Sequence, residues 1–490
     1  MAGLKTRTAH SLKWNLIDRT ATQLLYAVTG VVLARVLSQD DFGLVGAVLV
    51  FQAFAALLVD SGFSYALIQR KRPTKLDYST VLWFNLGVSA ALFAVLFACA
   101  PLIADCFQGD TRLIPLTRVM GLALILNASA IVQTNRLMKA MDVRFVAVSN
   151  SIGLVVGGVT GISLALTGFG AWAIVWQTLV TAAVKSAVLW TSSGWRPLWR
   201  FSMTSLRSYF GIGSRMMLTS FLNTVFQNIY SFFIGNRAGL TSLGYYTQSD
   251  KWSKMGITSL TQVLTSTFLP TLSAVQDDRA RFVAVLSKIN RFTAYLLFPS
   301  MMGLMLMAEP IFHVLFGTKW DPSVILFQLL LLRGIFTVLG TLYNNYILSL
   351  GHGGTLVRLE VIRDTVAIAA LIATLPFISR TTADNPVWGL ELMLWGQTAA
   401  SAVTWAVTLR SASKITGVTV RQYITDLMPY FAQTAVIIPV IKMAASVADT
   451  DLVRLAIEAA AGLVLYIGIN RLLGSKIQLE VFDYFRRPKK

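Results

Sequence analysis

The sequence predicts an all-α integral membrane protein with fourteen transmembrane helices, arranged as two six-helix bundles followed by two additional helices. Three observations predict this fold class: scarce charge, a series of long apolar segments and an internal repeat. Of 490 residues, 55% are hydrophobic and 13% are charged, with a mean hydropathy of +0.63. Soluble domains carry about 25% charged residues. We therefore expect most of the chain to lie in a lipid bilayer.

Long apolar segments recur along the whole chain. A helix of about 20 residues crosses the ~30 Å hydrocarbon core, and helices satisfy their backbone polar groups internally, as lipid requires. The fourteen segments are 14–37, 42–66, 80–104, 113–133, 145–167, 171–191, 209–235, 252–274, 292–314, 323–350, 355–377, 387–409, 427–447 and 452–473. The eighth is rich in Ser and Thr, so we expect it to face protein or water.

The basic residues lie mainly in alternate connections between these segments. An even number of segments places both termini on one side, and that side receives 28 of the 42 Lys and Arg residues, against nine on the other. Basic residues concentrate in cytoplasmic loops. We therefore expect both termini to be cytoplasmic, and the net charge of +19 to reflect topology rather than nucleic-acid binding.

The first and seventh segments end in similar sequences, "VVLARVLSQDDFGLVGAV" and "FFIGNRAGLTSLGYYTQS". With a one-residue gap, Arg35 matches Arg237 and Gly43 matches Gly244. Both segments start from the predicted cytoplasmic side, which indicates a parallel duplication about an axis along the membrane normal. Such repeats are frequent in transporters with a binding site between the halves.

The repeat divides the chain into four predicted parts. Residues 1–191 form an N-terminal six-helix bundle, and 192–208 form a cytoplasmic linker. Residues 209–410 form a C-terminal six-helix bundle, and 411–490 contain two additional helices and a basic cytoplasmic tail.

Charged residues within the apolar segments are candidates for function, since each costs about 2.5–3.5 kcal/mol near the bilayer centre. Arg333 lies about ten residues, or ~15 Å, inside its segment. It either faces a ligand or forms a structural pair with Glu391 or another acid. Arg19 and Arg215 lie about 9 Å inside theirs. Lys442 and Glu458, on the last two segments, could pair structurally.

Arginine suits a lipid-linked pyrophosphate, because its planar fork binds phosphate oxygens bidentately and stays protonated. Glu360 and Arg363 have the i,i+3 spacing of an internal pair, although Arg363 could also face a cavity. Asp60 is either a partner for an arginine in a gate or a local cap. The candidate substrate-binding residues are Arg19, Arg215, Arg333 and Arg363, and the candidate gating or ion-pair residues are Arg35, Asp60, Arg237 and Glu360.

No motif predicts catalysis, a metal site or a cofactor. The three histidines are scattered, and the sequence contains no Cys/His cluster with metal spacing, no P-loop and no nucleophile elbow. The connections are too short for a catalytic domain. We therefore expect a membrane protein that is not an enzyme.

The stretch "ARVLSQDDFGLVGAVLVFQAFAALLVDSGFSYALIQRK" resembles the opening of polysaccharide exporters of the multidrug/oligosaccharidyl-lipid/polysaccharide (MOP) flippase superfamily, the colanic-acid exporter type in particular. Further similar stretches, in the same order, are "APLIADCF", "LTGFGAWAIVWQ", "WRPLWRFS", "FLPTLSAVQDD" and "ILSLGHGGTLVRLEVIR". They extend to about residue 363. The resemblance implies the fourteen-helix MOP flippase fold, with two bundles around a central cavity.

The resemblance also implies a function: flipping undecaprenyl-pyrophosphate-linked oligosaccharide repeat units to the periplasmic leaflet by alternating access, for exopolysaccharide, O-antigen or capsule biosynthesis. The expected location is the inner membrane, as a monomer, with a polysaccharide polymerase and chain-length machinery as further partners. The alternative is a cation-coupled multidrug antiporter of the same superfamily, which would require a cavity acid. A polymerase or ligase would have a long periplasmic loop, and a structural scaffold would not explain Arg333.

Overall fold

A computed structural model gives the fold of residues 2–60, 63–70 and 72–480. It describes these residues without the side chains of 2–13, 15–16, 65, 210–216, 218–219 and 222. The described residues are almost entirely helical and contain no strand, apart from an isolated bridge between Thr382 and Asn385. The all-α prediction is confirmed.

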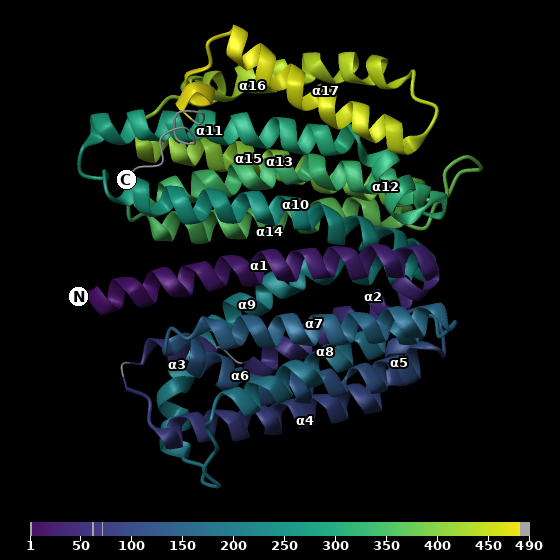
Figure 1. The fold of residues 1–490 in the computed structure, drawn as a ribbon, viewed down its shortest axis with the longest axis vertical. Helices are drawn as coiled ribbons and strands as arrows, with labels where there is room; N and C mark the ends of the chain where they lie inside the picture. The colour runs from purple at the N-terminus through teal and green to yellow at the C-terminus, as the bar shows by residue number, and fades with distance from the viewer. Residues whose placement is uncertain (1, 61–62, 71, 481–490) are drawn as a thin grey trace. The chain divides into compact units, whose positions relative to one another are not determined.

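The helices follow one another with short connections (Figure 1). They are α1 (Ala2–Val36), α2 (Gln39–Asp60), α3 (Phe63–Gln69), α4 (Lys75–Cys106), α5 (Leu113–Met120), α6 (Leu122–Lys139), α7 (Val143–Leu166), α8 (Ala171–Ser192), α9 (Met203–Ala238), α10 (Leu240–Ser273), α11 (Arg279–Leu306), α12 (Ala308–Phe316), η1 (Thr318–Trp320), α13 (Asp321–Ser349), α14 (Gly353–Thr374), η2 (Leu375–Phe377), α15 (Trp388–Thr416), α16 (Val420–Ala445) and α17 (Asp451–Leu472).

Each of the fourteen predicted segments falls on one helix or on two helices separated by a short break. The pairs are α5 with α6 and α11 with α12, while the predicted segment 42–66 covers α2 and the start of α3 on either side of residues 61–62, which lie outside the described residues. The last pair bends by 60° just before Pro310, in the first turn of α12, where a missing backbone N–H removes no helical hydrogen bond. The segments were therefore located correctly, but these breaks were not predicted.

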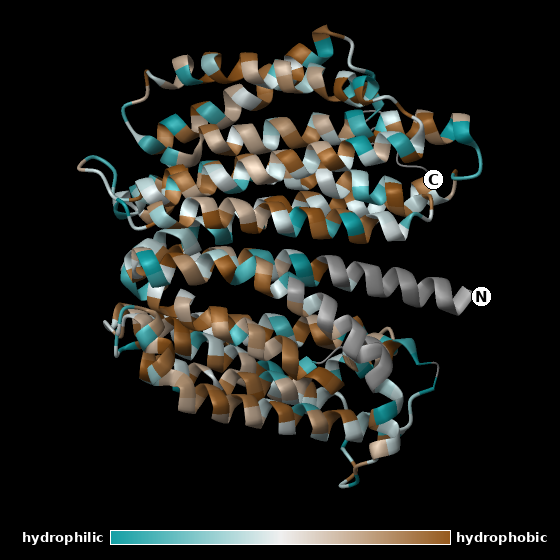
Figure 2. Cartoon of the chain, turned by 180° about the vertical axis from the view of Figure 1, so that it is seen from behind, coloured by the Kyte–Doolittle hydropathy of each residue, from teal (hydrophilic) through white to brown (hydrophobic). Residues whose placement is uncertain are grey.

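Judged by length and hydropathy, fewer helices qualify as membrane spans than the fourteen that the sequence predicts. Within the described part of the chain, eight helices are long and apolar enough to cross a membrane, or nine if the bent pair of α11 and α12 is one span. Figure 2 shows hydrophobic residues along the bodies of the helices and hydrophilic residues in many of the connections. The chain is thus a multi-pass membrane protein, and the full count of fourteen crossings stays a prediction.

Side-chain caps fix the start of several helices. Thr74 and Asp77 form a capping box at the start of α4, with Thr74 Oγ1 accepting from Asp77 N (3.2 Å) and Asp77 Oδ2 accepting from Thr74 N (2.8 Å). The side chains of Thr419 and Thr450 cap α16 and α17 in the same way, by accepting from a backbone N–H three residues later. These caps satisfy amides that the first helical turn leaves without partners.

The chain divides into two compact units, residues 1–244 and 245–490, and the boundary falls within α10. In the first unit, α7 packs against both α1 and α8, α6 packs against α4 and α8, and α2 packs against α9. In the second unit, α15 packs against α13 and α14, α16 packs against α11, and α17 packs against α16 and α12. The predicted four-part division of the chain stays a prediction.

Two glycines bring the starts of α2 and α10 into backbone contact. A Cβ on Gly43 would lie 1.8 Å from the carbonyl oxygen of Leu240, and a Cβ on Gly244 would lie 1.9 Å from that of Gln39. These are the two glycines that the repeat matched. Each follows a helix that ends with an exposed arginine in its last turn, Arg35 in α1 and Arg237 in α9. The matched sequences therefore occupy equivalent positions in the fold.

We predict that Gly43→Ala and Gly244→Ala destabilise the protein by about 1–3 kcal/mol each, the typical cost of overpacking. The measurement is unfolding of the detergent-solubilised protein. Gly87→Ala is the matched control, because Gly87 lies in α4 with no atom near its Cβ position. It should be neutral or stabilising, since alanine favours helices. A Gly43 variant as stable as the Gly87 variant would contradict the close contact.

Candidate functional site

Arg333 lies near the midpoint of α13, in a run of leucines. Its Nη1 donates a hydrogen bond of 2.5 Å to Oε1 of Gln397 on α15, the helix that packs most extensively against α13. Gln397 is buried, with 3% of its surface exposed. A guanidinium has five N–H donors, so this amide satisfies only part of its capacity and none of its charge.

The alternative of a structural ion pair at Arg333 does not hold. Glu391 accepts a hydrogen bond from Asn385 Nδ2 (2.6 Å) at the start of α15, six residues before Gln397. Among the side chains that the structure describes, no carboxylate lies within ion-pairing distance of Arg333. A neutral amide holds the guanidinium in place, so its positive charge remains available to an anion.

Arg363, in α14, is paired within its own helix. Its Nη2 lies 2.6 Å from Oε1 of Glu360 and 2.9 Å from Oδ1 of Asp364. The i,i+3 pair that the spacing predicted is therefore present. Two carboxylates around one guanidinium leave a local excess of negative charge, which makes Arg363 a poorer ligand for phosphate than Arg333.

A polar seam joins these residues within the second unit. On α13, Arg333, Thr337 and Thr341 follow at intervals of four residues, so they share one face of the helix. A pocket between α13, α14 and α15 continues the seam, and both Glu360 and Arg363 line it. The structure thus places Glu360 and Arg363 at one pocket, and Thr337, which also lines it, lies one turn from Arg333 on α13.

The remaining predicted site residues belong to the first unit. Arg19 is exposed on α1, and Arg215 belongs to α9, although its side chain lies outside the described residues. Arg35 and Arg237 are exposed at the ends of α1 and α9. Convergence of Arg19 and Arg215 with Arg333 on one cavity stays a prediction.

Asp60 belongs to a local hydrogen-bond chain at the end of α2. Its Oδ1 accepts from the Ser64 hydroxyl of α3, and the same hydroxyl oxygen accepts from Asn135 Nδ2 of α6 (2.7 Å). These hydrogen bonds between side chains join α2, α3 and α6 without an arginine, and the role of Asp60 as a gate partner or a local cap stays a prediction.

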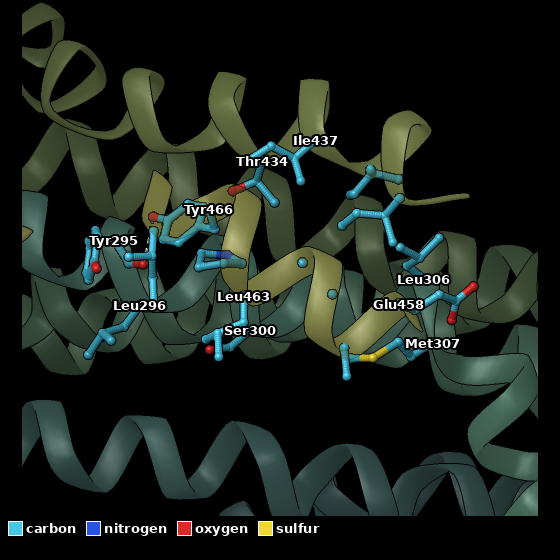
Figure 3. Close-up of a pocket in the computed structure, with 17 residues that line it drawn as sticks. Tyr295, Leu296, Ser300, Leu306, Met307, Thr434, Ile437, Glu458, Leu463 and Tyr466 are labelled. Carbon is cyan, nitrogen blue, oxygen red and sulfur yellow. Dashed lines mark hydrogen bonds between the residues drawn. The ribbon is translucent and has the colours of Figure 1, made fainter. Parts of the chain in front are cut away.

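An apolar pocket of about 360 Å³ lies between α11, α16 and α17 (Figure 3). Its lining includes Leu296, Pro299, Ile437 and Leu463, with Tyr295 and Tyr466 at one end and Glu458 and Met307 toward the other. Tyr466 donates to the backbone oxygen of Tyr295 at 2.9 Å. Hydrophobic side chains with few polar groups are the usual lining of a pocket for an apolar ligand.

Glu458 carries a buried carboxylate at that pocket. It pairs with Arg454 one turn earlier (Nε–Oε1, 3.3 Å), and Arg454 also contacts Glu309 of α12 (Nη2–Oε2, 2.9 Å). Oε2 of Glu458 is buried with no hydrogen-bond partner among the described residues. The described residues include no ion pair between Glu458 and Lys442, so their suggested pairing or functional role stays a prediction. The i,i+4 spacing from Arg454 was the signal that would have given the observed partner.

Sequence reasoning also missed a role for His313, near the end of α12. Its Nδ1 lies 3.0 Å from Oδ2 of Asp451 at the start of α17, and its Nε2 lies 2.8 Å from Oδ1 of Asp321 at the start of α13. One imidazole thus joins the ends of three helices that are distant in sequence, which no local pattern could reveal.

The fold is similar to that of solved transporters, one of them assigned to the MOP superfamily. A solved structure of the lipid II flippase MurJ, in an inward closed conformation, superposes with a TM-score of 0.71 at 14% identity, covering 94% of this chain and 99% of that one. An inward-facing multidrug resistance MATE family transporter of the MOP superfamily gives a TM-score of 0.61 at 17% identity, covering 82% and 99%. At these identities the likeness shows the fold.

The chain belongs to the polysaccharide biosynthesis protein family, whose profile it matches over residues 32–325. It is 28% identical to the succinoglycan biosynthesis transport protein ExoT of Rhizobium meliloti, over 78% of this chain and 75% of that protein. It is 23% identical to the lipopolysaccharide biosynthesis protein WzxC of Escherichia coli, over 75% of each chain. The resemblance to polysaccharide exporters is confirmed.

We predict that Arg454→Leu destabilises the protein by about 3–5 kcal/mol, because it leaves the buried Glu458 carboxylate without its cation. The double variant Arg454→Leu/Glu458→Leu should recover most of that loss, since apolar replacement of a buried pair is often neutral. Unfolding of the detergent-solubilised protein measures both. Equal stability of the single variant and the wild type would show that the pair contributes nothing.

Proposed function

We propose that this protein is a flippase that moves undecaprenyl-pyrophosphate-linked oligosaccharide repeat units from the cytoplasmic to the periplasmic leaflet by alternating access. The observation that carries the proposal is the guanidinium of Arg333, held near the middle of α13 by a neutral amide in a chain of the polysaccharide biosynthesis protein family. An uncompensated arginine at this depth is costly and therefore indicates a function. Phosphate is the ligand that its planar fork fits best.

The second unit also offers a place for the lipid part of such a substrate. The pocket between α11, α16 and α17 is lined mainly by aliphatic and aromatic side chains, which suit an isoprenoid chain. Many side chains on α17 are exposed and apolar, among them Leu463, Val464 and Leu472. We therefore expect α16 and α17, the two helices beyond the predicted bundles, to bind the lipid chain, and α13 and α15 to bind the headgroup.

The membrane potential favours outward movement of the anionic headgroup, by about 2.3 kcal/mol per charge per 100 mV. The proposal includes an inner-membrane location with both termini cytoplasmic, consistent with the basic residues in alternate connections. It also includes a transport rather than an enzymatic role, action as a monomer, and cooperation with a polymerase and chain-length machinery.

Deletion of the gene tests the proposal directly. We expect a large loss of exported polymer and an accumulation of lipid-linked repeat units that a membrane-impermeant reagent cannot reach from the periplasmic side of spheroplasts. Unchanged polymer combined with new drug sensitivity would favour the multidrug antiporter instead.

Arg333→Ala should lower export about ten- to hundred-fold, because hydrogen bonds to a charged group contribute about 1.5–3 kcal/mol. Arg333→Lys should retain part of the activity, since it keeps the charge but loses the bidentate fork. Arg410→Ala is the matched control, because Arg410 is exposed near the end of α15, outside the polar seam. Polymer export at equal protein level is the measurement. Normal export by both Arg333 variants would rule out a headgroup role for Arg333.

A further inference from the structure

The pocket between α13, α14 and α15 is unusually polar for a site on apolar helices. Six hydroxyl or amide side chains line it: Thr337, Thr341, Asn344, Ser401, Thr404 and Thr408. The cavity volume is about 90 Å³, and the pocket has an open mouth. Side chains of this kind are not needed to hold α13 against α15, since small or apolar residues would pack equally well. Their gathering in one pocket therefore favours a ligand of matching polarity.

Each threonine hydroxyl in the pocket already donates its one hydrogen bond to the backbone of its own helix. Thr341 Oγ1 donates to the backbone oxygen of Thr337 (2.9 Å), and Thr404 Oγ1 donates to that of Ala400 (2.8 Å). Thr337 and Thr408 make the same bond to the carbonyl four residues earlier. A hydroxyl has one donor and two acceptor lone pairs, so each oxygen can still accept a hydrogen bond from a ligand.

Asn344 adds an acceptor without a partner. Its Oδ1 is buried and makes no hydrogen bond to any of the described residues. The strongest donor at the pocket, Arg363, is occupied by Glu360 and Asp364. Acceptors therefore dominate the lining, but Trp405 Nε1 is a buried donor that also has no hydrogen-bond partner among the described residues. The pocket favours a ligand with several O–H or N–H donors and at least one acceptor, as a sugar hydroxyl provides.

Two aromatic rings supply the apolar part of the lining. Phe336 of α13 and Trp405 of α15 lie with ring centroids 5.7 Å apart and planes inclined at 53°. A pyranose has one apolar face of C–H groups and a rim of hydroxyls. Aromatic faces beside a row of acceptors fit both parts of such a ring, whereas a metal ion would gain no ligand from either aromatic side chain.

The pocket begins close in sequence to Arg333, the residue that we propose to bind phosphate. Thr337 lies one turn, about 6 Å, from Arg333 along α13, and Asn344 lies about 16 Å from it. In a lipid-linked oligosaccharide the first sugars follow the pyrophosphate directly. The order along α13 thus reproduces the order of groups in the substrate.

We propose that this pocket is a sugar subsite, which accepts hydroxyl or N-acetyl donors from the glycan while Arg333 holds the phosphate. The inference rests on the proposed function and specifies the part of the substrate that the second unit recognises. An anion is disfavoured by the acceptor lining and by the acidic excess around Arg363.

Binding of simple sugars to the full-length protein in lipid nanodiscs tests the subsite. The probes are methyl β-glucopyranoside, methyl β-galactopyranoside and N-acetylglucosamine, observed by saturation-transfer NMR. The double variant Thr341→Val/Thr404→Val removes two acceptors without changing side-chain shape, and we expect about ten-fold weaker binding. Thr160→Val is the matched control, because Thr160 makes the same bond to its own helix on an exposed part of α7. It should bind as the wild type does.

Two results would overturn the subsite: no saturable binding of any probe to the wild type, or equal binding by the double variant. Thr404→Ser keeps the hydroxyl and should retain binding, which separates a lost acceptor from a folding defect. Thermal unfolding in the same nanodiscs checks that each variant is folded.

Export in cells separates this inference from the proposed function. If deletion traps lipid-linked repeat units but the double variant exports normally, the sugar subsite is wrong and the flippase proposal stands. If deletion leaves lipid-linked repeat units and polymer unchanged, the flippase proposal fails, even if the sugar probes bind to the protein in nanodiscs.

Discussion

A permanent charge in the middle of an apolar helix constrains much of the second unit. Arg333 cannot lose its proton, and its depth in α13 keeps it from reaching water along its own helix. Gln397 of α15 supplies one acceptor for the guanidinium. This hydrogen bond therefore favours contact between α15 and α13. The polar seam that extends from this pair lowers the cost of the charge and gives a hydrophilic ligand a surface to follow.

Most of the fold could be predicted from the sequence, because the length and hydropathy of a segment indicate whether it can cross the bilayer. Every predicted segment falls on a helix or a broken pair, and the matched glycines, Gly43 and Gly244, proved to be equivalent and in mutual contact. The breaks were missed for a physical reason. The residues on both sides of Met307 are apolar, so hydropathy does not reveal the 60° bend, and only Pro310 marks it.

The site was accessible only in part. Arg333 stands out because charge is rare in such a segment, and the pair of Glu360 with Arg363 follows from spacing within one helix. Gln397 could not be found in this way, because its partner lies 64 residues earlier. The threonines of α15 are equally inconspicuous. Threonine is common in membrane helices, and only packing shows which of them surround a pocket.

The contacts of His313 have a consequence for how three helix ends stay together. Both ring nitrogens lie within hydrogen-bond distance of a carboxylate oxygen, one from Asp451 and one from Asp321. A neutral imidazole donates from one nitrogen only, and the other would then face a carboxylate lone pair to lone pair. The imidazolium donates from both nitrogens and so satisfies both carboxylates. Protonation of His313 therefore stabilises the contacts of α12 with both α13 and α17.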